Sequence, residues 1–206
     1  QTLSILPASA EAQTREPRGV VGNVTSLLMR ERRSVTLMLW ATFFLCFSSI
    51  YFLLSWIPRL MEQAGYSAET GRLAFFLFNA GGVIGIFILG GLATYGRLTN
   101  LVFAFLFSSA LCMVIFAMVP SQPALLMGII FLMGLLQQGG FTGLYAVAAK
   151  IYPTEVRSTG IGWAIGFGRS GAVVGPALAG VLIAAGLGMS GNYLLFAVPV
   201  AFCGVV

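Results

Sequence analysis

The sequence has no histidine and no aspartate, and its acidic residues are limited to six glutamates. A His-based catalytic triad, a His-ligated zinc or haem site and a two-aspartate proteolytic site therefore all lack their parts. On this ground we expect that the chain is not an enzyme and that it binds no metal and no other cofactor.

Charged residues are also scarce. They make up 8% of the chain, against roughly 25% in soluble proteins, whereas hydrophobic residues reach 58% and the mean hydropathy is +0.95. So few charges cannot cover a globule in water, and the composition indicates a protein dissolved mainly in the lipid bilayer. The net charge of +5 does not indicate nucleic-acid binding, because all cations except Arg169 lie in short segments between apolar runs.

Apolar runs, uncharged except for Arg169, divide the chain, and a bilayer-spanning helix needs about 20 such residues. They lie between Arg33 and Arg59, from Leu73 to Gly96, from Leu98 to Ala149 with a break at Pro120–Pro123, from Ser158 to Gly186, and from about Tyr193 to Val206. The two prolines of the break end one helix and start the next. The sequence therefore predicts an all-α integral membrane protein, a six-helix bundle.

The last of these runs has roughly 14 residues, too few to cross about 30 Å of hydrocarbon. We therefore expect the sixth helix to be truncated. The chain also begins with glutamine rather than methionine. Both ends are accordingly expected to be fragment ends.

Cations alternate between the segments that join the predicted spans. Arg59, Arg72 and Arg169 aside, all of them fall in the leading segment, near Arg97, or between Lys150 and Arg157. By the positive-inside rule these segments are cytoplasmic. We expect a multi-pass protein of the cell membrane, with a cytoplasmic N-terminal segment over residues 1–33 and a membrane domain over residues 34–206.

Glycine pairs at four-residue spacing recur in the spans. Small residues at this spacing let helix backbones approach closely in lipid. The pairs are Gly81 and Gly85, Gly139 and Gly143, Gly162 and Gly166, and Gly171 and Gly175. We expect all four pairs at helix–helix contacts, and the glycine-free run 98–119 at the lipid-facing periphery, an arrangement that suits two inverted three-helix repeats.

Arg169 is the one charge inside a predicted span. It lies roughly 16 Å into the helix that starts near Ser158, close to the bilayer centre, where a charge costs a few kcal/mol. A guanidinium that faces a water-filled cavity and forks onto a substrate carboxylate would offset that cost. The alternative is a structural ion pair or snorkelling, although no span contains an acid that could be its partner.

Other polar and aromatic residues in the spans are candidates for the same cavity. Each taken alone is more often a helix-to-helix hydrogen bond than a ligand contact. The candidates for substrate contact beside Arg169 are Tyr51, Asn79, Gln138, Tyr145 and Trp163.

Three stretches carry a resemblance to a known family. They are YPTEVRSTGIGWAIGFGRSGAVVGPALAG (Tyr152–Gly180), YFLLSWIPRLMEQAGYS (Tyr51–Ser67) and LFNAGGVIG (Leu77–Gly85). The first resembles the tenth-to-eleventh helix connection and eleventh helix of the aromatic acid:proton symporters in the major facilitator superfamily. The other two resemble that family's seventh and eighth helices. The resemblance implies that the bundle corresponds to helices seven to twelve of a twelve-helix carrier, preceded by part of its central cytoplasmic loop.

The cytoplasmic loops resemble the family's gating elements less closely. In its full form the superfamily motif places an acid and a base before a Gly-Arg pair, but here it reads GLATYGR (Gly91–Arg97), with Thr94 and Tyr95 at those positions. The resemblance thus implies a gating role for Arg97 and leaves its ion pair in doubt. Glu155 and Arg157 could latch the inward face, although a solvated charge pair is worth little.

The resemblance implies secondary active transport, the proton-coupled uptake of an aromatic carboxylate whose charge meets Arg169. No group in these spans titrates near neutrality, so we expect the proton-carrying carboxylate in a missing N-terminal six-helix half of the same polypeptide. The other expected partners are the lipid bilayer, a small organic anion and a proton. The alternatives are a carrier of another organic anion or of a sugar-like metabolite and, from a different class, a six-helix channel subunit or an intramembrane enzyme.

Overall fold

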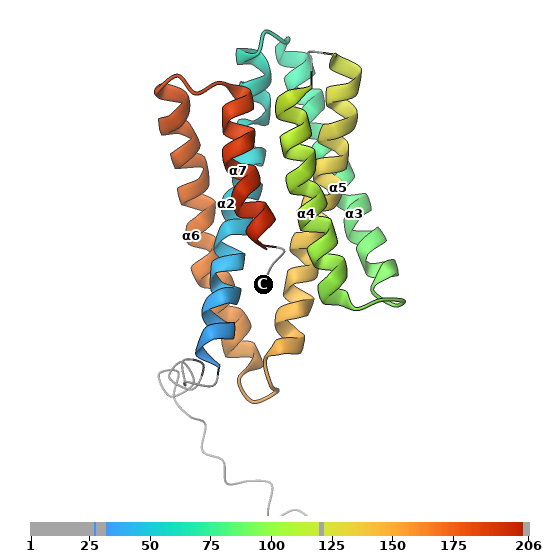
Figure 1. The fold of residues 1–206 in the computed structure, drawn as a ribbon, viewed down its shortest axis with the longest axis vertical. Helices are drawn as coiled ribbons and strands as arrows, with labels where there is room; N and C mark the ends of the chain where they lie inside the picture. Colours follow the sequence, from blue (N-terminus) through green and yellow to red (C-terminus); the bar gives the residue numbers. More distant parts are fainter. Residues whose placement is uncertain (1–26, 28–31, 120–121, 204–206) are drawn as a thin grey trace, which may run out of the picture.

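The computed structural model describes residues 27, 32–119 and 122–203. This part of the chain is helical and contains no strand (Figure 1). Its long helices are α2 (Arg33–Gln63), α3 (Ala68–Leu92), α4 (Leu98–Met118), α5 (Pro123–Ile151), α6 (Arg157–Ala184) and α7 (Met189–Cys203). The first five are long and apolar enough to cross a membrane, by length and composition, and α7 is a shorter apolar helix. The predicted all-α membrane architecture is confirmed.

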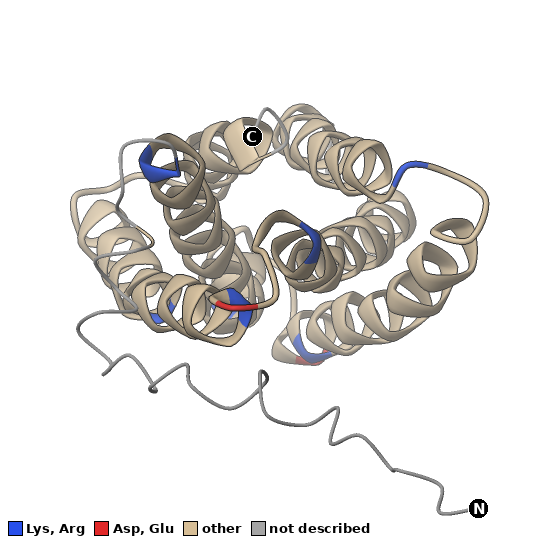
Figure 2. Ribbon diagram, turned by 90° about the horizontal axis from the view of Figure 1, so that it is seen from below, with Lys and Arg blue, Asp and Glu red and all other residues tan. Residues whose placement is uncertain are grey.

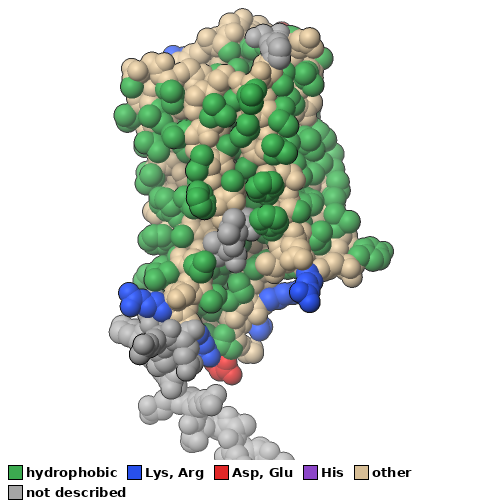
Figure 3. Space-filling model, in the orientation of Figure 1, with side chains coloured by type: hydrophobic (Ala, Val, Ile, Leu, Met, Phe, Trp, Pro, Cys, Tyr) green, Lys and Arg blue, Asp and Glu red, His purple; other side chains and the backbone are tan. Residues whose placement is uncertain are grey.

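Parts of two predictions lie outside the described residues. The structure does not describe residues 1–26 and 28–31, which are most of the expected cytoplasmic segment, or residues 204–206 of the last apolar run. Within the described residues, hydrophobic side chains cover the height of the bundle in the view of Figure 3, as a lipid-facing surface requires.

Local sequence sets the α2–α3 connection. Gly65 has φ of +90° and ends α2 in a left-handed conformation, which lets the Tyr66 N–H donate to the Met61 carbonyl at 3.1 Å. Ser67 then caps α3, since its hydroxyl accepts a hydrogen bond from the Thr70 N–H at 3.2 Å. As a result α2 extends beyond the first predicted span, and α3 begins before the second.

The helices do not pack in sequence order. α3 packs along α5 and α6 packs along α2, whereas the consecutive pairs α3 and α4, and α6 and α7, barely touch. α4 lies against α5 and α7, and the lipid-facing position expected for this glycine-free helix stays a prediction. If α2–α4 and α5–α7 are two repeats, the α3–α5 and α6–α2 contacts are equivalent, which is the pattern that inverted repeats give.

Most cations gather at one end of the bundle. The start of α2, the α3–α4 connection and the α5–α6 connection all lie at the lower end of Figure 1, and the α2–α3 and α6–α7 connections lie at the upper end. Figure 2 looks onto this lower end, where the Lys and Arg positions are distributed over separate helix ends. We call it the charged end.

Six of the predicted packing glycines lie at helix–helix contacts: Gly81 and Gly85 against α5, Gly139 and Gly143 against α3 and α4, and Gly171 and Gly175 against α2. A Cβ on Gly139, for example, would lie 2.8 Å from the carbonyl oxygen of Gly85. The fourth pair differs from the expectation. A Cβ on Gly162 or Gly166 would meet nothing within 4 Å, because these two residues lie on the side of α6 that faces away from α2.

Candidate functional site

Arg169 lies near the middle of α6, roughly 18 Å along the axis from the helix start at Arg157. Its side chain is exposed in this chain. The acids of the described part are Glu62, Glu69 and Glu155, which all lie at helix ends or in connections. The described residues therefore provide no carboxylate at the depth of Arg169 that could neutralise its charge.

Five aromatic rings from α2 and α5 form one cluster at the same level. The centroid of the Phe141 ring lies 4.8 Å from that of Phe47 and 5.3 Å from that of Tyr145. The Tyr145 and Phe43 ring centroids are 5.2 Å apart. All three pairs meet edge to face, with interplanar angles of 80°, 81° and 87°, an arrangement favoured by the ring quadrupoles. Tyr51 extends the group, 6.0 Å from Phe47. We call these residues the five-ring cluster.

Arg169 borders this cluster. It follows Gly168, whose backbone packs against Phe43 and Phe47, and Tyr51 joins the cluster through Phe47. Tyr51 is exposed and Tyr145 is half-buried, so both phenols present part of their surface. The structure thus places Tyr51 and Tyr145 in one ring cluster, and it places Arg169 next to the α6 residue that packs on this cluster.

Gly168 is a site residue that the sequence reasoning missed. A Cβ there would lie 2.8 Å from Cβ of Phe43 and 2.9 Å from Cδ2 of Phe47. The α6 backbone therefore lies directly against the five-ring cluster, one residue before Arg169. A signal was available, because Gly168 continues a row of small residues along the buried face of α6: Gly160, Ala164, Gly168, Gly171, Gly175 and Ala179.

Trp163 belongs to a different group of rings. It stacks on Trp40 at 6.0 Å, and Phe167 stacks on the same indole at 5.6 Å. These rings line an open cleft of about 740 Å³, together with Gly162, Gly166 and the hydroxyl side chains of α6. Trp163 is therefore separate from the five-ring cluster, and the cleft explains why the glycine pair meets no helix.

Gln138 and Asn79 use their amide donors in the fold. Nε2 of Gln138 donates to the Phe78 carbonyl at 3.2 Å, which links α5 to α3. Nδ2 of Asn79 donates to the Phe75 carbonyl one turn back in its own helix, at 2.9 Å. These contacts are of the helix-stabilising kind, and a substrate contact through the remaining amide atoms of both residues stays a prediction.

The predicted gating residues all lie at the charged end. Arg97 and Glu155 are exposed in their connections. Arg157 is half-buried, and its Nε donates to the Tyr152 carbonyl at 3.2 Å. Tyr152 is in turn buried against Gly160. Arg157 therefore holds the backbone of its own loop, and this described contact does not involve Glu155.

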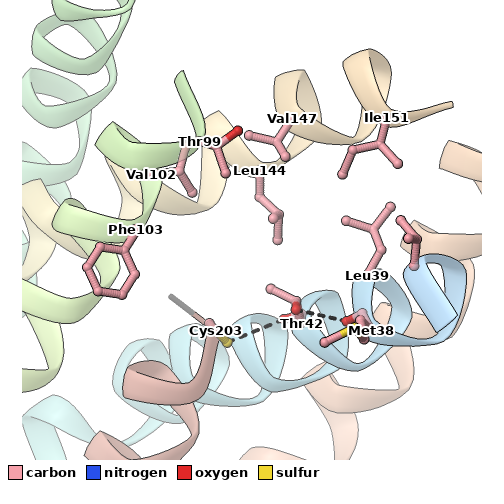
Figure 4. A pocket seen from close by; sticks show the side chains of 11 residues that line it. Met38, Leu39, Thr42, Thr99, Val102, Phe103, Leu144, Val147, Ile151 and Cys203 are labelled. Carbon is pink, nitrogen blue, oxygen red and sulfur yellow. Dashed lines mark hydrogen bonds between the residues drawn. The ribbon is translucent and has the colours of Figure 1, made fainter. Parts of the chain in front are cut away.

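A smaller pocket of about 80 Å³ lies among α2, α4, α5 and the end of α7 (Figure 4). Its polar groups are Thr42, Thr99 and Cys203, and no charged side chain lines it. Thr42 donates to the Met38 carbonyl at 2.9 Å, and the Cys203 thiol donates to the Thr42 carbonyl at 3.5 Å. Without a cation this pocket is unsuited to a carboxylate, in contrast to the region of Arg169.

Comparisons with known proteins point to one family. The model of the Major Facilitator Superfamily matches residues 38–206. The benzoate transport protein of Acinetobacter baylyi is 32% identical, over 98% of this chain and 42% of that protein. The gallate transporter of Pseudomonas putida is 34% identical, over 84% of this chain and 38% of that protein. The 4-hydroxybenzoate transporter PcaK of Acinetobacter baylyi is 33% identical, over 72% of this chain and 32% of that protein. The chain thus spans less than half the length of these relatives.

Proposed function

The chain belongs to the major facilitator superfamily, and from that premise we propose that it is part of a secondary active transporter for the proton-coupled uptake of an aromatic carboxylate. The family and the similar proteins are transporters, so the chain is not an enzyme. Benzoate, gallate and 4-hydroxybenzoate, the compounds in the relatives' names, all combine a benzene ring with a carboxylate. The observation that carries the proposal is Arg169, a mid-helix cation that has no carboxylate at its depth among the described residues and that borders a cluster of aromatic rings.

The substrate anion binds Arg169. A carboxylate that leaves water loses its hydration, and the planar guanidinium replaces part of it with two parallel N–H donors. The hydroxyls of Tyr51 and Tyr145 offer further donors. The substrate ring packs against Phe141 and Tyr145, whose partly exposed edges continue the edge-to-face pattern already present in the five-ring cluster.

The proton requires a group that the described part of this chain does not supply within its membrane spans. Its sequence has no histidine and no aspartate, and the described glutamates lie at helix ends or in connections. The proton-carrying carboxylate therefore belongs to an N-terminal six-helix half of the same polypeptide. The limited coverage of the relatives, 42% for the benzoate transport protein, supports this arrangement.

The charged end faces the cytoplasm in this proposal. Residues 1–33 belong to the central cytoplasmic loop, residues 34–206 form the C-terminal membrane half, and the protein resides in the cell membrane. Arg97, Glu155 and Arg157 then lie on the inner side, where Arg157 stabilises the α5–α6 connection through its bond to Tyr152.

Uptake of radiolabelled benzoate by the full-length protein in proteoliposomes, under an imposed pH gradient, tests the proposal. Arg169→Ala should abolish saturable uptake, and Arg169→Lys should weaken binding by about 1–3 kcal/mol, since it retains the charge but loses the fork. Arg72→Ala, which removes an exposed cation at the opposite end from the charged end, is the matched control.

Two results would contradict this assignment. Normal uptake by Arg169→Ala would show that another part of the protein holds the anion. A wild-type protein that takes up an aliphatic acid or a sugar and ignores benzoate would show that the transporter carries another substrate class. If Arg169→Ala fails to insert into the membrane, the structural role of this residue is the correct one.

A further inference from the structure

We infer that a cleft at the end of the bundle opposite the charged end is a second binding station for the same anionic aromatic substrate, with Arg59 as its cation. This inference rests on the proposed transport function. The cleft has a volume of about 740 Å³ and lies between the last turns of α2 and the C-terminal part of α6. Its lining combines a cation, an amide, a hydroxyl and an indole, which are contributed by Arg59, Gln63, Ser55 and Trp56.

Trp56 forms a fixed wall of this cleft. Its indole N–H donates to the Pro176 carbonyl at 3.0 Å, which ties α2 to α6 and sets the orientation of the ring. The ring lies across Gly180, where a Cβ would be 3.2 Å from Cζ2 of the indole. Because its one polar atom is already bonded, the indole offers the cleft an apolar surface, which suits contact with a substrate ring.

Arg59 gives the cleft its charge. Its side chain is exposed, and Glu62, the neighbouring acid on α2, is not part of the lining. The Gln63 amide and the Ser55 hydroxyl add neutral donors beside it. A guanidinium next to an aromatic wall can bind the carboxylate of an aromatic acid while the wall contacts its ring.

The cleft lies on the same two helices as the Arg169 site, α2 and α6. Tyr51, Ser55 and Arg59 follow one another at four-residue spacing and therefore share one face of α2. Arg59 lies roughly 12 Å along the helix from Tyr51. A substrate held at Arg59 would therefore lie on the same face of α2 as Tyr51 of the five-ring cluster.

The place of Arg59 suggests what the second station does. Arg59 and Arg72 are the described cations near this end, which is the outer end if the charged end is cytoplasmic. A cation inside a cleft attracts anions from solution and raises their local concentration. The station therefore captures the substrate before it reaches Arg169, which should lower the apparent KM without changing kcat.

The first experiment measures benzoate uptake by the full-length protein in proteoliposomes at about 20 mM and about 500 mM salt. Arg59→Gln should raise KM about fivefold at low salt with kcat unchanged, and added salt should abolish the difference from wild type. Arg72→Gln, an exposed cation outside the cleft, should leave KM unchanged. An equal rise in both variants would indicate a general field effect and overturn the inference, and so would no rise at Arg59.

The second experiment detects occupancy without transport. In the Arg169→Ala protein, where the first station is lost, titration with 4-nitrobenzoate should still quench tryptophan fluorescence. Trp56→Phe in that background should remove this quenching, whereas Trp163→Phe should not. If the wild type takes up benzoate but no Trp56-dependent quenching occurs, the second station is refuted while the transport function stands. If the wild type neither binds nor takes up aromatic acids, the proposed function itself fails.

Discussion

Replacing Gly171 or Gly166 by alanine should have opposite effects on stability, although both belong to four-residue glycine pairs of α6. A Cβ on Gly171 would lie 3.0 Å from the carbonyl carbon of Phe44 and 3.1 Å from the backbone nitrogen of Ser48, and it would be closer still to the Phe44 oxygen. On Gly166 it would meet nothing within 4 Å. Only the first replacement forces α6 away from α2.

The comparison of the two variants isolates the packing energy. Each exchange gains about 1 kcal/mol of helix propensity, so this contribution cancels in the difference. Overpacking typically costs about 1–3 kcal/mol. We expect the upper part of that range, because the atoms in the way at Gly171 are backbone and cannot rotate aside. Gly171→Ala should therefore be about 2–3 kcal/mol less stable than Gly166→Ala, roughly a 30- to 150-fold change in the unfolding equilibrium.

Thermal unfolding of the full-length protein in detergent, followed with a thiol-reactive dye, measures this difference. The three cysteines of the chain, Cys46, Cys112 and Cys203, are buried and become reactive when the helices separate. We expect a clearly lower Tm for Gly171→Ala and an unchanged or higher Tm for Gly166→Ala. Equal Tm values would refute the packing argument, and a loss at Gly166 would show that this face is covered in the full-length protein.

Two further predictions concern a buried polar pair and the topology. Ser109→Ala should destabilise the protein by about 1–2 kcal/mol, because it removes the 2.6 Å hydrogen bond to Oε1 of the fully buried Gln137. Adding Gln137→Leu should restore part of the lost stability in the same dye assay. A double variant that is no more stable than Ser109→Ala would count against this account. Cysteines introduced at Thr99 and Thr154 should react with an impermeant maleimide from the cytoplasmic face of vesicles, and a cysteine introduced at Ser67 should react from the other face. Labelling of all three positions from one face would contradict the topology.

The helices could be predicted from charge and hydropathy, but some of their ends could not. Arg59 was taken as the end of the first span, yet α2 continues to Gln63. A helix does not stop where the hydrocarbon stops, since its backbone hydrogen bonds persist in the headgroup region. Gly65 sets the end of α2 instead, and the cap at Ser67 sets the start of α3. Hydropathy does not indicate these local backbone conformations.

The candidate site was predicted only in part. Arg169, Tyr51 and Tyr145 were chosen for their chemistry, and the structure places the two tyrosines in one ring cluster and Arg169 next to the α6 residue that packs on it. Phe141 was not predicted, because a phenylalanine in an apolar span looks like any other lipid-facing residue until its neighbours are known. Gln138 and Asn79 were chosen on the same grounds as Tyr145, but their hydrogen bonds to backbone carbonyls depend on which helix turns come close.

The sequence by itself determined that the chain is a set of apolar helices with one cation, Arg169, in the middle of a span, because hydropathy and charge are properties of each segment alone. It also provided four glycine pairs that permit close packing. Only the tertiary structure decided that three of these pairs meet another helix while Gly162 and Gly166 line an open cleft. The reason is that glycine merely removes a steric obstacle, and whether a neighbouring backbone occupies the space depends on how the helices interleave, with α3 along α5 and α6 along α2.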